Sequence, residues 1–255
     1  MKAPAFDYVR AGTVTEACAL LGQHGADARL LAGGQSLLPA MNLRLASPSV
    51  LIDVGRITGL DGIEVRADKL RIGALVRHET VLRSTQIAKH VPLLTEAMRH
   101  VAHPAIRARG TMGGNLAHAD PASELPACML ALGAAIEATS ARGTRMIAAE
   151  YFFTGLFQTA LEPDEMLTAI QIPLPAPRFF FQEIARRSGD YAIVGLAASG
   201  DRLAFFSVGD RPLLFQASAS LDLDPPADLQ ATAAMRVHLA GVLRQRALTA
   251  LGIQA

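Results

Sequence analysis

Apolar residues in the first 175 positions recur at spacings that alternate between helical and extended structure. A first helix is predicted between the capping box of Thr13 and Glu16 and a stop at Gly25, because the apolar residues between them share one face. Two further helices are predicted to begin near Pro92 and after Ser123. The short apolar runs predict strands at 29–32, 50–54, 134–138, 145–148 and 166–172, and a strand–turn–strand unit over 62–76. This mixture indicates an α+β fold.

Three alternating prolines change this pattern. Pro173, Pro175 and Pro177 favour an extended, stiff connector over a helix or a central strand, so we place a domain boundary there. Beyond it the pattern predicts three antiparallel strands and a closing helix, at 179–187, 191–199, 202–208 and 231–251. The predicted apolar face of that helix consists of Met235, Leu239, Val242, Leu243 and Ala247.

The composition excludes several classes of partner. The net charge of the 255 residues is +1 and no block is rich in Lys or Arg, so nothing indicates binding to nucleic acid. The longest apolar run, at about 128–136, is far shorter than the roughly 20 residues of a membrane span. Asp7 and Arg10 interrupt the start of the chain, which argues against a signal peptide. We therefore expect a cytoplasmic protein without a membrane span.

The chain has two cysteines, Cys18 and Cys128. Each falls in an apolar helical pattern, so both are interpreted as small buried apolar residues rather than as disulfide partners or ligands. An iron–sulfur cluster usually needs four thiolates. The chain is therefore not expected to hold such a cluster by itself.

Two glycine pairs, Gly33-Gly34 and Gly113-Gly114, lie at predicted strand–loop and loop–helix junctions. Glycines let successive backbone N–H groups converge on one anion, and they let a phosphate approach closely. Neutral donors accompany them: Gln35, Ser36, Thr111 and Asn115. Neither loop has the Lys of a nucleoside-triphosphate loop or the G-x-G-x-x-G pattern of a Rossmann site. The pattern suits the diphosphate of a dinucleotide cofactor, although a single Gly-Gly is more often an ordinary turn.

Other polar residues predict no chemistry. His100, His103 and Asp120 lack the spacing of a metal site, so the histidines are interpreted as surface or capping residues. Asp120 and Glu124 lie four residues apart at a predicted helix start, where the helix dipole favours carboxylates. Ser36 is not in a G-x-S-x-G motif. We predict neither a catalytic residue nor a metal site in this chain.

Three long segments, 32–44, 103–127 and 185–198, make the sequence recognisable. In order and spacing they resemble the FAD-binding medium subunit of molybdenum hydroxylases. That family includes the flavoprotein subunit of aerobic carbon-monoxide dehydrogenase and the flavin domain of xanthine dehydrogenase. The closing stretch 219–248 is also similar to the end of these proteins, so the resemblance covers nearly the whole chain.

The resemblance implies a two-part architecture. Residues 1–175 would form a FAD-binding domain of the vanillyl-alcohol-oxidase (PCMH) type, with subdomains of about 1–55 and 56–175. Residues 178–255 would form a smaller α/β domain, similar to the C-terminal domain of the carbon-monoxide dehydrogenase flavoprotein. That domain is shortened between Gln216 and Ala219 relative to the family pattern.

The resemblance also implies the residues of a FAD site. The first glycine loop would cradle the pyrophosphate of FAD, and the second would hold its other side. Asp120 would reach the ribityl or ribose region, and Leu167 would pack on the cofactor. Asp190 and Tyr191 would lie beside the isoalloxazine ring, with Tyr191 shielding one face. The implied site residues are Ala32, Gly33, Gly34, Gln35, Ser36, Leu37, Thr111, Gly113, Gly114, Asn115, Asp120, Leu167, Asp190 and Tyr191.

The implied activity is that of an oxidoreductase subunit that relays electrons in a heterotrimer. A large partner would hold the molybdopterin cofactor, and a small partner would hold [2Fe-2S] clusters. FAD on this chain would collect the electrons and pass them to NAD⁺, a quinone or another acceptor. No residue of this chain would need to act as a catalytic acid or base.

One departure from the family pattern leaves alternatives open. Many relatives carry Lys where this chain has Glu183, and a missing cation would weaken the stabilisation of an anionic reduced flavin unless Arg186 or Arg187 substitutes. One alternative is a self-sufficient FAD-dependent oxidoreductase of the same fold, which would need its own acid–base group. Another is a non-enzymatic assembly subunit with a decayed flavin site.

Overall fold

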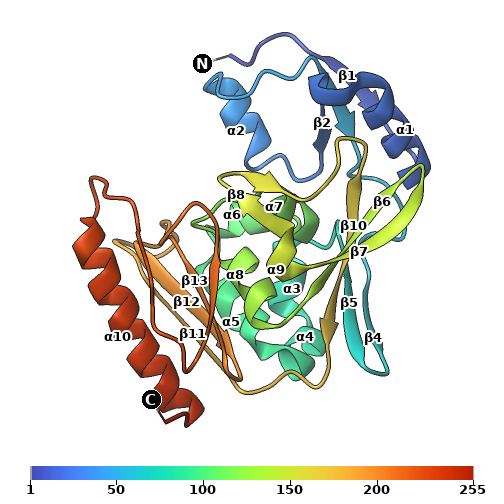
Figure 1. The fold of residues 1–255 in the computed structure, drawn as a ribbon. Coiled ribbons are helices and arrows are strands. Elements are labelled where there is room, and N and C mark those ends of the chain that lie inside the picture. Colours follow the sequence, from blue (N-terminus) through green and yellow to red (C-terminus); the bar gives the residue numbers. More distant parts are fainter. Residues whose placement is uncertain (1, 255) are drawn as a thin grey trace.

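The N-terminal part of the chain folds around a small parallel sheet, at the top of Figure 1. The computed structural model describes residues 2–254. Strand β3 lies between β1 and β2 and is parallel to both, with Ile52 opposite Val9 and Leu30. The elements of this part are β1 (Asp7–Arg10), α1 (Val14–His24), the 3-10 turn η1 (Gly25–Asp27), β2 (Ala28–Leu31), α2 (Leu37–Asn42) and β3 (Val50–Asp53).

The predicted capping box at the start of α1 is confirmed. The Thr13 hydroxyl accepts a hydrogen bond from the Glu16 amide at 3.1 Å, and the Glu16 carboxylate accepts one from the Gly12 amide at 2.7 Å. Gly25 ends the helix in a conformation with φ of +54°, which glycine adopts without strain. The local signals therefore give the correct limits of this helix.

The central part contains a five-stranded antiparallel sheet in the order β4-β5-β10-β6-β7. Its middle strand β10 is almost entirely buried, which agrees with the nearly continuous apolar run in its sequence. The strands are β4 (Ile63–Arg66), β5 (Lys69–Gly73), β6 (Ala135–Ser140), β7 (Gly143–Ala148) and β10 (Met166–Pro173). The predicted strand–turn–strand unit over 62–76 is confirmed by β4 and β5.

A layer of short helices packs beside this sheet. The helices predicted near Pro92 and after Ser123 are confirmed as α5 and α8, and both bury apolar faces. The layer and its connections are α3 (His78–Arg83), α4 (Thr85–His90), α5 (Pro92–His100), α6 (Pro104–Arg107), α7 (Met112–His118), α8 (Glu124–Ala131), α9 (Ala149–Phe152) and the hairpin of β8 (Phe153–Gly155) with β9 (Gln158–Thr159).

The C-terminal part is a four-stranded antiparallel meander covered by one long helix. Alternating residues of β12 and β13 face opposite ways: Leu196 and Phe205 pack towards α10, whereas Ala197 and Phe206 join the core of the helical layer. The elements are β11 (Phe179–Ile184), β12 (Val194–Ser199), β13 (Arg202–Phe206), β14 (Leu213–Gln216) and α10 (Ala233–Leu251). Residues 217–232 between β14 and α10 form neither helix nor strand.

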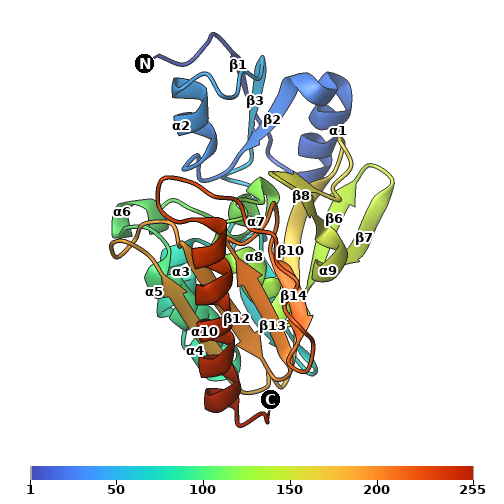
Figure 2. The same ribbon diagram turned by 60° about the vertical axis from the view of Figure 1, so that its left-hand side comes forward.

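These elements stack in layers. From left to right, Figure 1 shows α10, the C-terminal sheet, the helical layer and the five-stranded sheet. Figure 2 shows the N-terminal part seated above the end of these layers that holds α7 and β8. Helix α8 contacts α5 and α7 on the helical side and both β12 and β13 on the other. The helical layer is therefore shared by the two sheets.

Two sequence predictions for the C-terminal part are wrong in detail. Strand β11 ends at Ile184 and β12 begins at Val194, so 185–193 form a loop, which the hydrogen bond from the Ile193 amide to the Ile184 carbonyl closes at 2.7 Å. Met235 is half exposed, whereas Arg236 lies in the buried stripe of α10. Arg236 tolerates burial because it donates hydrogen bonds to two backbone carbonyls and to Asp228. Leu243 and Ala247 are buried as predicted.

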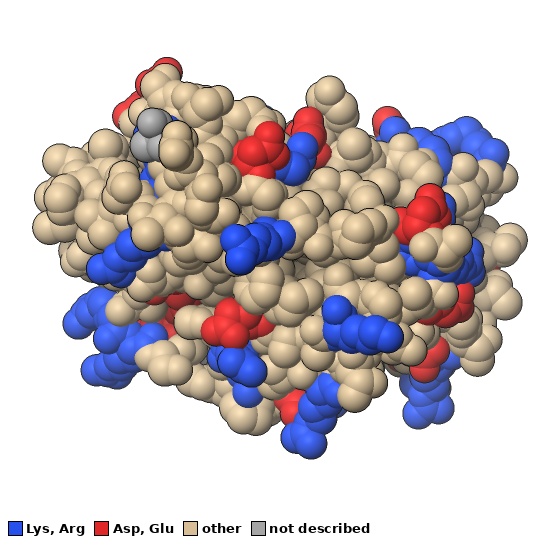
Figure 3. Space-filling model, turned by 90° about the horizontal axis from the view of Figure 1, so that it is seen from below, with Lys and Arg blue, Asp and Glu red and all other residues tan. Residues whose placement is uncertain are grey.

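Three further findings concern helix length, surface charge and the cysteines. No helix formed by residues 2–254 is long and apolar enough to cross a membrane. On the face opposite the N-terminal part, Lys and Arg are interspersed with Asp and Glu among uncharged residues (Figure 3). Cys18 and Cys128 are both free and buried, as predicted, and burial raises the pKa of the Cys128 thiol.

We expect Gly241→Ala to raise the free energy of unfolding by about 1 kcal/mol, because glycine is that much less favourable than alanine inside a helix. An added Cβ at Gly241 would meet nothing within 4 Å. The matched control is Gly252→Ala at the end of the same helix, where φ is +72° and a side chain is strained. In urea denaturation, the urea concentration at the midpoint of unfolding should be higher than that of the unmodified chain for Gly241→Ala and lower for Gly252→Ala. A lower midpoint for Gly241→Ala would contradict this account.

Candidate functional site

A cavity of about 840 Å³ lies between the N-terminal part and the layers below it. Its volume falls within the roughly 300–1,000 Å³ typical of ligand sites. Every residue predicted for the site lines this one cavity: 32–37 between β2 and α2, Thr111, Gly113, Gly114 and Asn115 at the start of α7, Asp120 between α7 and α8, Leu167 in β10, and Asp190 and Tyr191 in the loop 185–193. The structure therefore brings together segments that are up to 159 residues apart in sequence (residues 32 to 191).

The first glycine loop presents a row of free backbone donors. Among the hydrogen bonds of residues 2–254, none uses the amide N–H of Gly33, Gly34, Gln35 or Ser36 as donor. Gly34 has φ of +72° and Gly33 is buried, so the two glycines form a tight turn at the start of this row. Buried backbone donors nearly always have a partner. Of the four residues, Gly33 is buried, Gly34 and Gln35 are half-buried and Ser36 is exposed. Successive free amides on a cavity wall can converge on one anionic ligand.

The two glycine loops are in direct contact. A Cβ added to Gly33 would lie 2.4 Å from the Arg109 carbonyl oxygen and 3.0 Å from the Cα of Gly110. Both neighbours are backbone atoms, so no side chain can move aside to make room. Gly33 is therefore required for the packing that places the first loop against the second.

The second glycine loop differs from the first in how its amides are used. The Met112 amide donates to the Val76 carbonyl at 3.0 Å, and the Gly113 amide donates to the Ala74 carbonyl at 2.8 Å. The Gly114 amide donates to the Thr111 hydroxyl at 3.1 Å, so Thr111 caps α7. A Cβ on Gly113 would lie 2.7 Å from the Cβ of Ala74. This loop therefore contributes close packing and shape, whereas the first loop contributes the free donors.

Two residues that the sequence analysis missed hold the second loop in place. The Arg77 guanidinium donates to the Arg109 carbonyl, and the His78 Nε2–H donates to the Thr111 carbonyl at 3.0 Å. The His78 side chain is buried and its Nδ1 has no partner, and burial lowers its pKa to about 4. His78 is therefore neutral at pH 7, with its proton on Nε2. A histidine beside an apolar run carries no sequence signal for this role.

Further polar residues line the cavity. Asn115 and Ser123 hydrogen-bond each other, with Asn115 Nδ2 at 2.9 Å from the Ser123 hydroxyl and Asn115 Oδ1 at 3.0 Å from it. The Asp120 carboxylate accepts from the Ala122 amide at 2.9 Å. Loss of hydration around the Tyr191 hydroxyl, followed by the charge of Asp120, raises the pKa of Tyr191 to about 12. The ring itself is 60% exposed, so it is available to cover a ligand.

Glu124 also lines the cavity, which the sequence analysis did not predict. It is the first residue of α8, the position expected for it, but it is only 6% exposed. Burial, followed by the charges of Glu183 and Asp120, raises the pKa of Glu124 to about 8. The carboxyl is therefore mostly protonated at pH 7. Sequence spacing could not reveal this, because the burial comes from elements distant in the chain.

Four other residues considered in the sequence are Glu183, Arg186, Arg187 and His103, and only His103 lines the cavity. Glu183 pairs with His100, whose Nδ1 lies 3.2 Å from the Glu183 Oε1. Arg186 and Arg187 are exposed and neither lines the cavity, so neither replaces a cation there. His103 precedes α6 at its N-cap and touches the cavity wall. Among residues 2–254, no three His, Cys, Asp or Glu side chains come together as a metal site would require.

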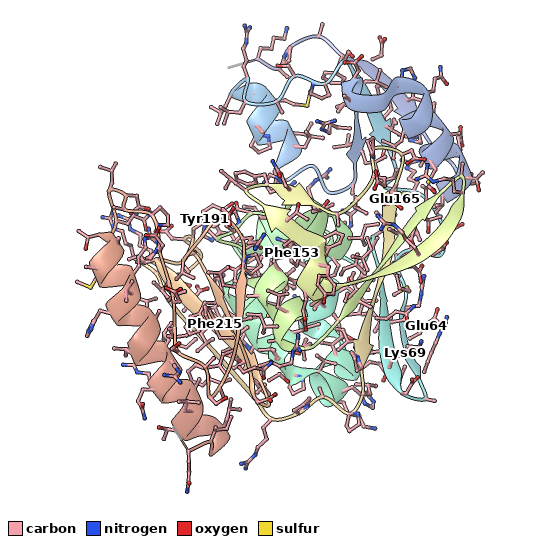
Figure 4. All side chains as sticks on the ribbon, in the orientation of Figure 1. Glu64, Lys69, Phe153, Glu165, Tyr191 and Phe215 are labelled. Atoms are coloured by element: carbon pink, nitrogen blue, oxygen red, sulfur yellow. The ribbon has the colours of Figure 1, made fainter. Side chains whose placement is uncertain are left out.

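The cavity has room for a sizeable ligand and free amides suited to an anionic group. Tyr191 and Glu165, both on its wall, lie on opposite sides beneath the N-terminal part in Figure 4. The free amides of residues 33–36 lie on the same wall and suit phosphate oxygens. The glycine packing brings backbone, rather than side chains, up to that position. The cavity volume and these free donors suit a dinucleotide such as FAD.

Comparisons with known proteins agree with this geometry. Residues 4–175 match the family described as the FAD binding domain in molybdopterin dehydrogenase. The chain is 46% identical to the nicotine 6-hydroxylase medium subunit of Paenarthrobacter nicotinovorans over 197 residues, which cover 77% of this chain and 69% of that one. It is 36% identical to the carbon monoxide dehydrogenase medium chain of Afipia carboxidovorans, with 95% of each chain covered. A solved structure of carbon monoxide dehydrogenase from Hydrogenophaga pseudoflava superposes with a TM-score of 0.92 at 34% identity, covering 98% of both chains.

Proposed function

Since the chain belongs to the family of FAD-binding medium subunits of molybdenum hydroxylases, we propose that it relays electrons through FAD from iron–sulfur clusters of a partner to an external acceptor. The family match makes the chain an oxidoreductase subunit. The direction of electron flow and the identity of the two partners are the parts that we propose.

The observation that carries the proposal is the row of unpaired amides at 33–36 on the wall of one cavity. These amides would bind the pyrophosphate oxygens, and Gly33 would keep the loop pressed against the Arg109 carbonyl. A bound flavin takes up electrons singly and releases them singly or as hydride, which suits a subunit between one-electron carriers and a hydride acceptor.

The other cavity residues would orient and shield the cofactor. We assign Tyr191 to one face of the isoalloxazine ring, because its exposed ring is anchored beside Asp120 at the cavity. Leu167 would pack on the cofactor from the central strand β10. In this proposal residues 1–175 form the FAD domain, and 178–255 form a second domain that contributes Asp190 and Tyr191.

Two partners complete the relay. The chain has only two cysteines, and both are buried in apolar surroundings, so the iron–sulfur clusters would belong to a small partner. The relatives from nicotine 6-hydroxylase and carbon monoxide dehydrogenase are named medium subunit and medium chain, which agrees with a larger chain that holds the molybdopterin cofactor. The final acceptor would be NAD⁺, a quinone or another carrier.

The test is to purify the chain alone, load it with FAD and add nicotine, caffeine or carbon monoxide without oxygen. We expect one FAD per chain, all of it released by acid precipitation, and no bleaching by any of these substrates. Bleaching should appear only after the co-purifying molybdenum and iron–sulfur chains are added together with the substrate of the complex. Bleaching by an organic substrate without partners would instead indicate a self-sufficient oxidoreductase, and a chain that binds no FAD would indicate an assembly subunit.

A further inference from the structure

Three ionisable side chains from three elements lie between the wall of the cavity and the outside of the molecule. Glu124 of α8 lines the cavity and is 6% exposed. Glu183 of β11 lies behind the wall, with its side chain 5% exposed. His100 at the end of α5 is 35% exposed at its side chain and therefore reaches solvent. Helix α5 packs against both α8 and β11, and the charges of Glu183 and His100 both act on the pKa of Glu124. No hydrogen bond among residues 2–254 joins Glu124 directly to Glu183, so a donor that moves must bridge these two carboxyls.

Only one of the two carboxylate oxygens of Glu183 has a partner among residues 2–254. Its Oε1 lies 3.2 Å from His100 Nδ1, whereas its Oε2 is buried and has no hydrogen-bond partner in residues 2–254. The His100 ring is held against Phe181, with ring centroids 5.1 Å apart, and Phe181 stacks on Phe206. A buried carboxylate oxygen without a partner is costly unless something else interacts with it. The free oxygen can therefore accept a hydrogen bond from a donor that moves.

The charges around Glu124 keep a proton in this region. Burial raises the pKa of Glu124 to about 8, and the negative charges of Glu183 and Asp120 add to this effect. The positive charge of His100 lowers the pKa in part. Glu183 raises the pKa of His100, because the pair is more stable when the ring is charged. Two other groups face Glu124, Tyr191 from the loop 185–193 and Cys128 from α8, and the pKa of each is raised, so both stay neutral. At pH 7 the cavity wall thus holds a neutral acid.

We propose that Glu124, Glu183 and His100 form a proton route between solvent and the cavity. This inference rests on the proposed function, in which iron–sulfur clusters deliver electrons singly and without protons. For each pair of electrons that arrives, one proton must enter the cavity. It leaves the O–H of Glu124, and water restores it through His100 and Glu183. When the acceptor takes up a hydride, that proton departs with the two electrons, so charge and atoms balance.

A simpler role for Glu124 is that of a hydrogen-bond donor to the cofactor. Glu124→Gln separates the two roles, because an amide still donates a hydrogen bond but cannot give up and regain a proton. Glu183→Gln and His100→Gln test the rest of the route, and neither of these residues lines the cavity. Glu64→Gln is the matched control, since Glu64 is an exposed carboxylate on β4 that pairs with Arg66 (Figure 4).

The experiment uses the full chain loaded with FAD and reduced anaerobically by reduced methyl viologen, which donates single electrons and no proton. Proton uptake is followed with an indicator dye in weak buffer, alongside flavin bleaching. At pH 7 we expect Glu124→Gln and Glu183→Gln to slow proton uptake by about 100-fold, the lower end of what a positioned proton donor contributes. His100→Gln should slow it less and be rescued by added imidazole. Glu64→Gln should match the unmodified chain.

Unchanged proton uptake in both Glu183→Gln and His100→Gln would overturn the route, whether or not Glu124→Gln still binds FAD. A second readout needs no flavin. At pH 7 the infrared spectrum of the FAD-free chain should show a buried protonated carboxyl band that Glu124→Gln removes, and its persistence in that variant would also overturn the proposal. If the unmodified chain takes up no FAD, the proposed function fails at the loading step, before any proton is measured.

Discussion

Gly33→Ala should weaken FAD binding by up to about 100-fold while the fold outside the loop survives. The new Cβ would lie 2.4 Å from the Arg109 carbonyl oxygen, closer than such atoms approach in proteins, and backbone surrounds it. The loop must therefore move, and the amides of residues 33–36 move with it. Overpacking of this kind costs about 1–3 kcal/mol. At 1.4 kcal/mol for each factor of ten, the upper value corresponds to roughly 100-fold in affinity.

Titration of the flavin-free chain with FAD, followed by flavin fluorescence, measures this effect. Gly62→Ala is the control, because its Cβ would meet only the Glu64 carboxylate at 3.9 Å. Circular dichroism of both variants should match that of the unmodified chain. Unchanged FAD affinity in Gly33→Ala would mean that the pyrophosphate does not bind at this loop.

Gly195→Ala should lower the free energy of unfolding by about 3 kcal/mol, the upper end of the usual cost of overpacking. A Cβ at Gly195 would lie 1.9 Å from Cζ of Phe206, the residue opposite it on β13. Phe206 is fully buried and stacks on Phe181, so its ring has no free space to turn into. The clash must therefore separate β12 from β13 or displace the helical layer.

Urea denaturation gives the change, and a second substitution tests its cause. Phe206→Leu removes the ring, so it should be less harmful in the Gly195→Ala background than in the unmodified chain. Additive losses in the double variant would show that the ring is not the reason. Equal stability of Gly195→Ala and the unmodified chain would show that the sheet accommodates the methyl group.

Local signals were reliable where a few neighbouring residues decide the structure. Thr13, Glu16 and Gly25 define one helix through hydrogen bonds and backbone geometry within a single turn of each end. The glycine pairs likewise marked loops that reach the cavity, since close backbone approach requires glycine whatever the rest of the fold. The family resemblance then supplied the overall architecture, which the structural comparison confirmed.

Sequence patterns do not reveal the environment of a residue where elements distant in the chain decide it. Glu124 looked like a carboxylate at a helix start, yet burial against the cavity and proximity to Glu183 give it an altered pKa. His78 offered no pattern, because its role depends on a carbonyl 33 residues away. Arg236 is a charged residue that the apolar pattern of α10 places outside the buried face. Its burial is explained by the hydrogen bonds that it donates to the carbonyls of Ile193 and Ser207. Nor does the sequence tell which backbone amides of the two glycine loops donate a hydrogen bond within the chain and which remain free.

The helical layer shared by the two sheets has a consequence for how the protein can be divided. The family match ends at residue 175, but the core of the helical layer continues into Ala197, Ala204 and Phe206 of the C-terminal sheet. A fragment cut at the proline connector would leave apolar side chains of α5 and α8 facing water, a surface prone to aggregation. The segment that the family model matches is therefore smaller than the unit that folds, and a fusion or exchange of the flavin module of this chain should carry the meander along with the FAD domain.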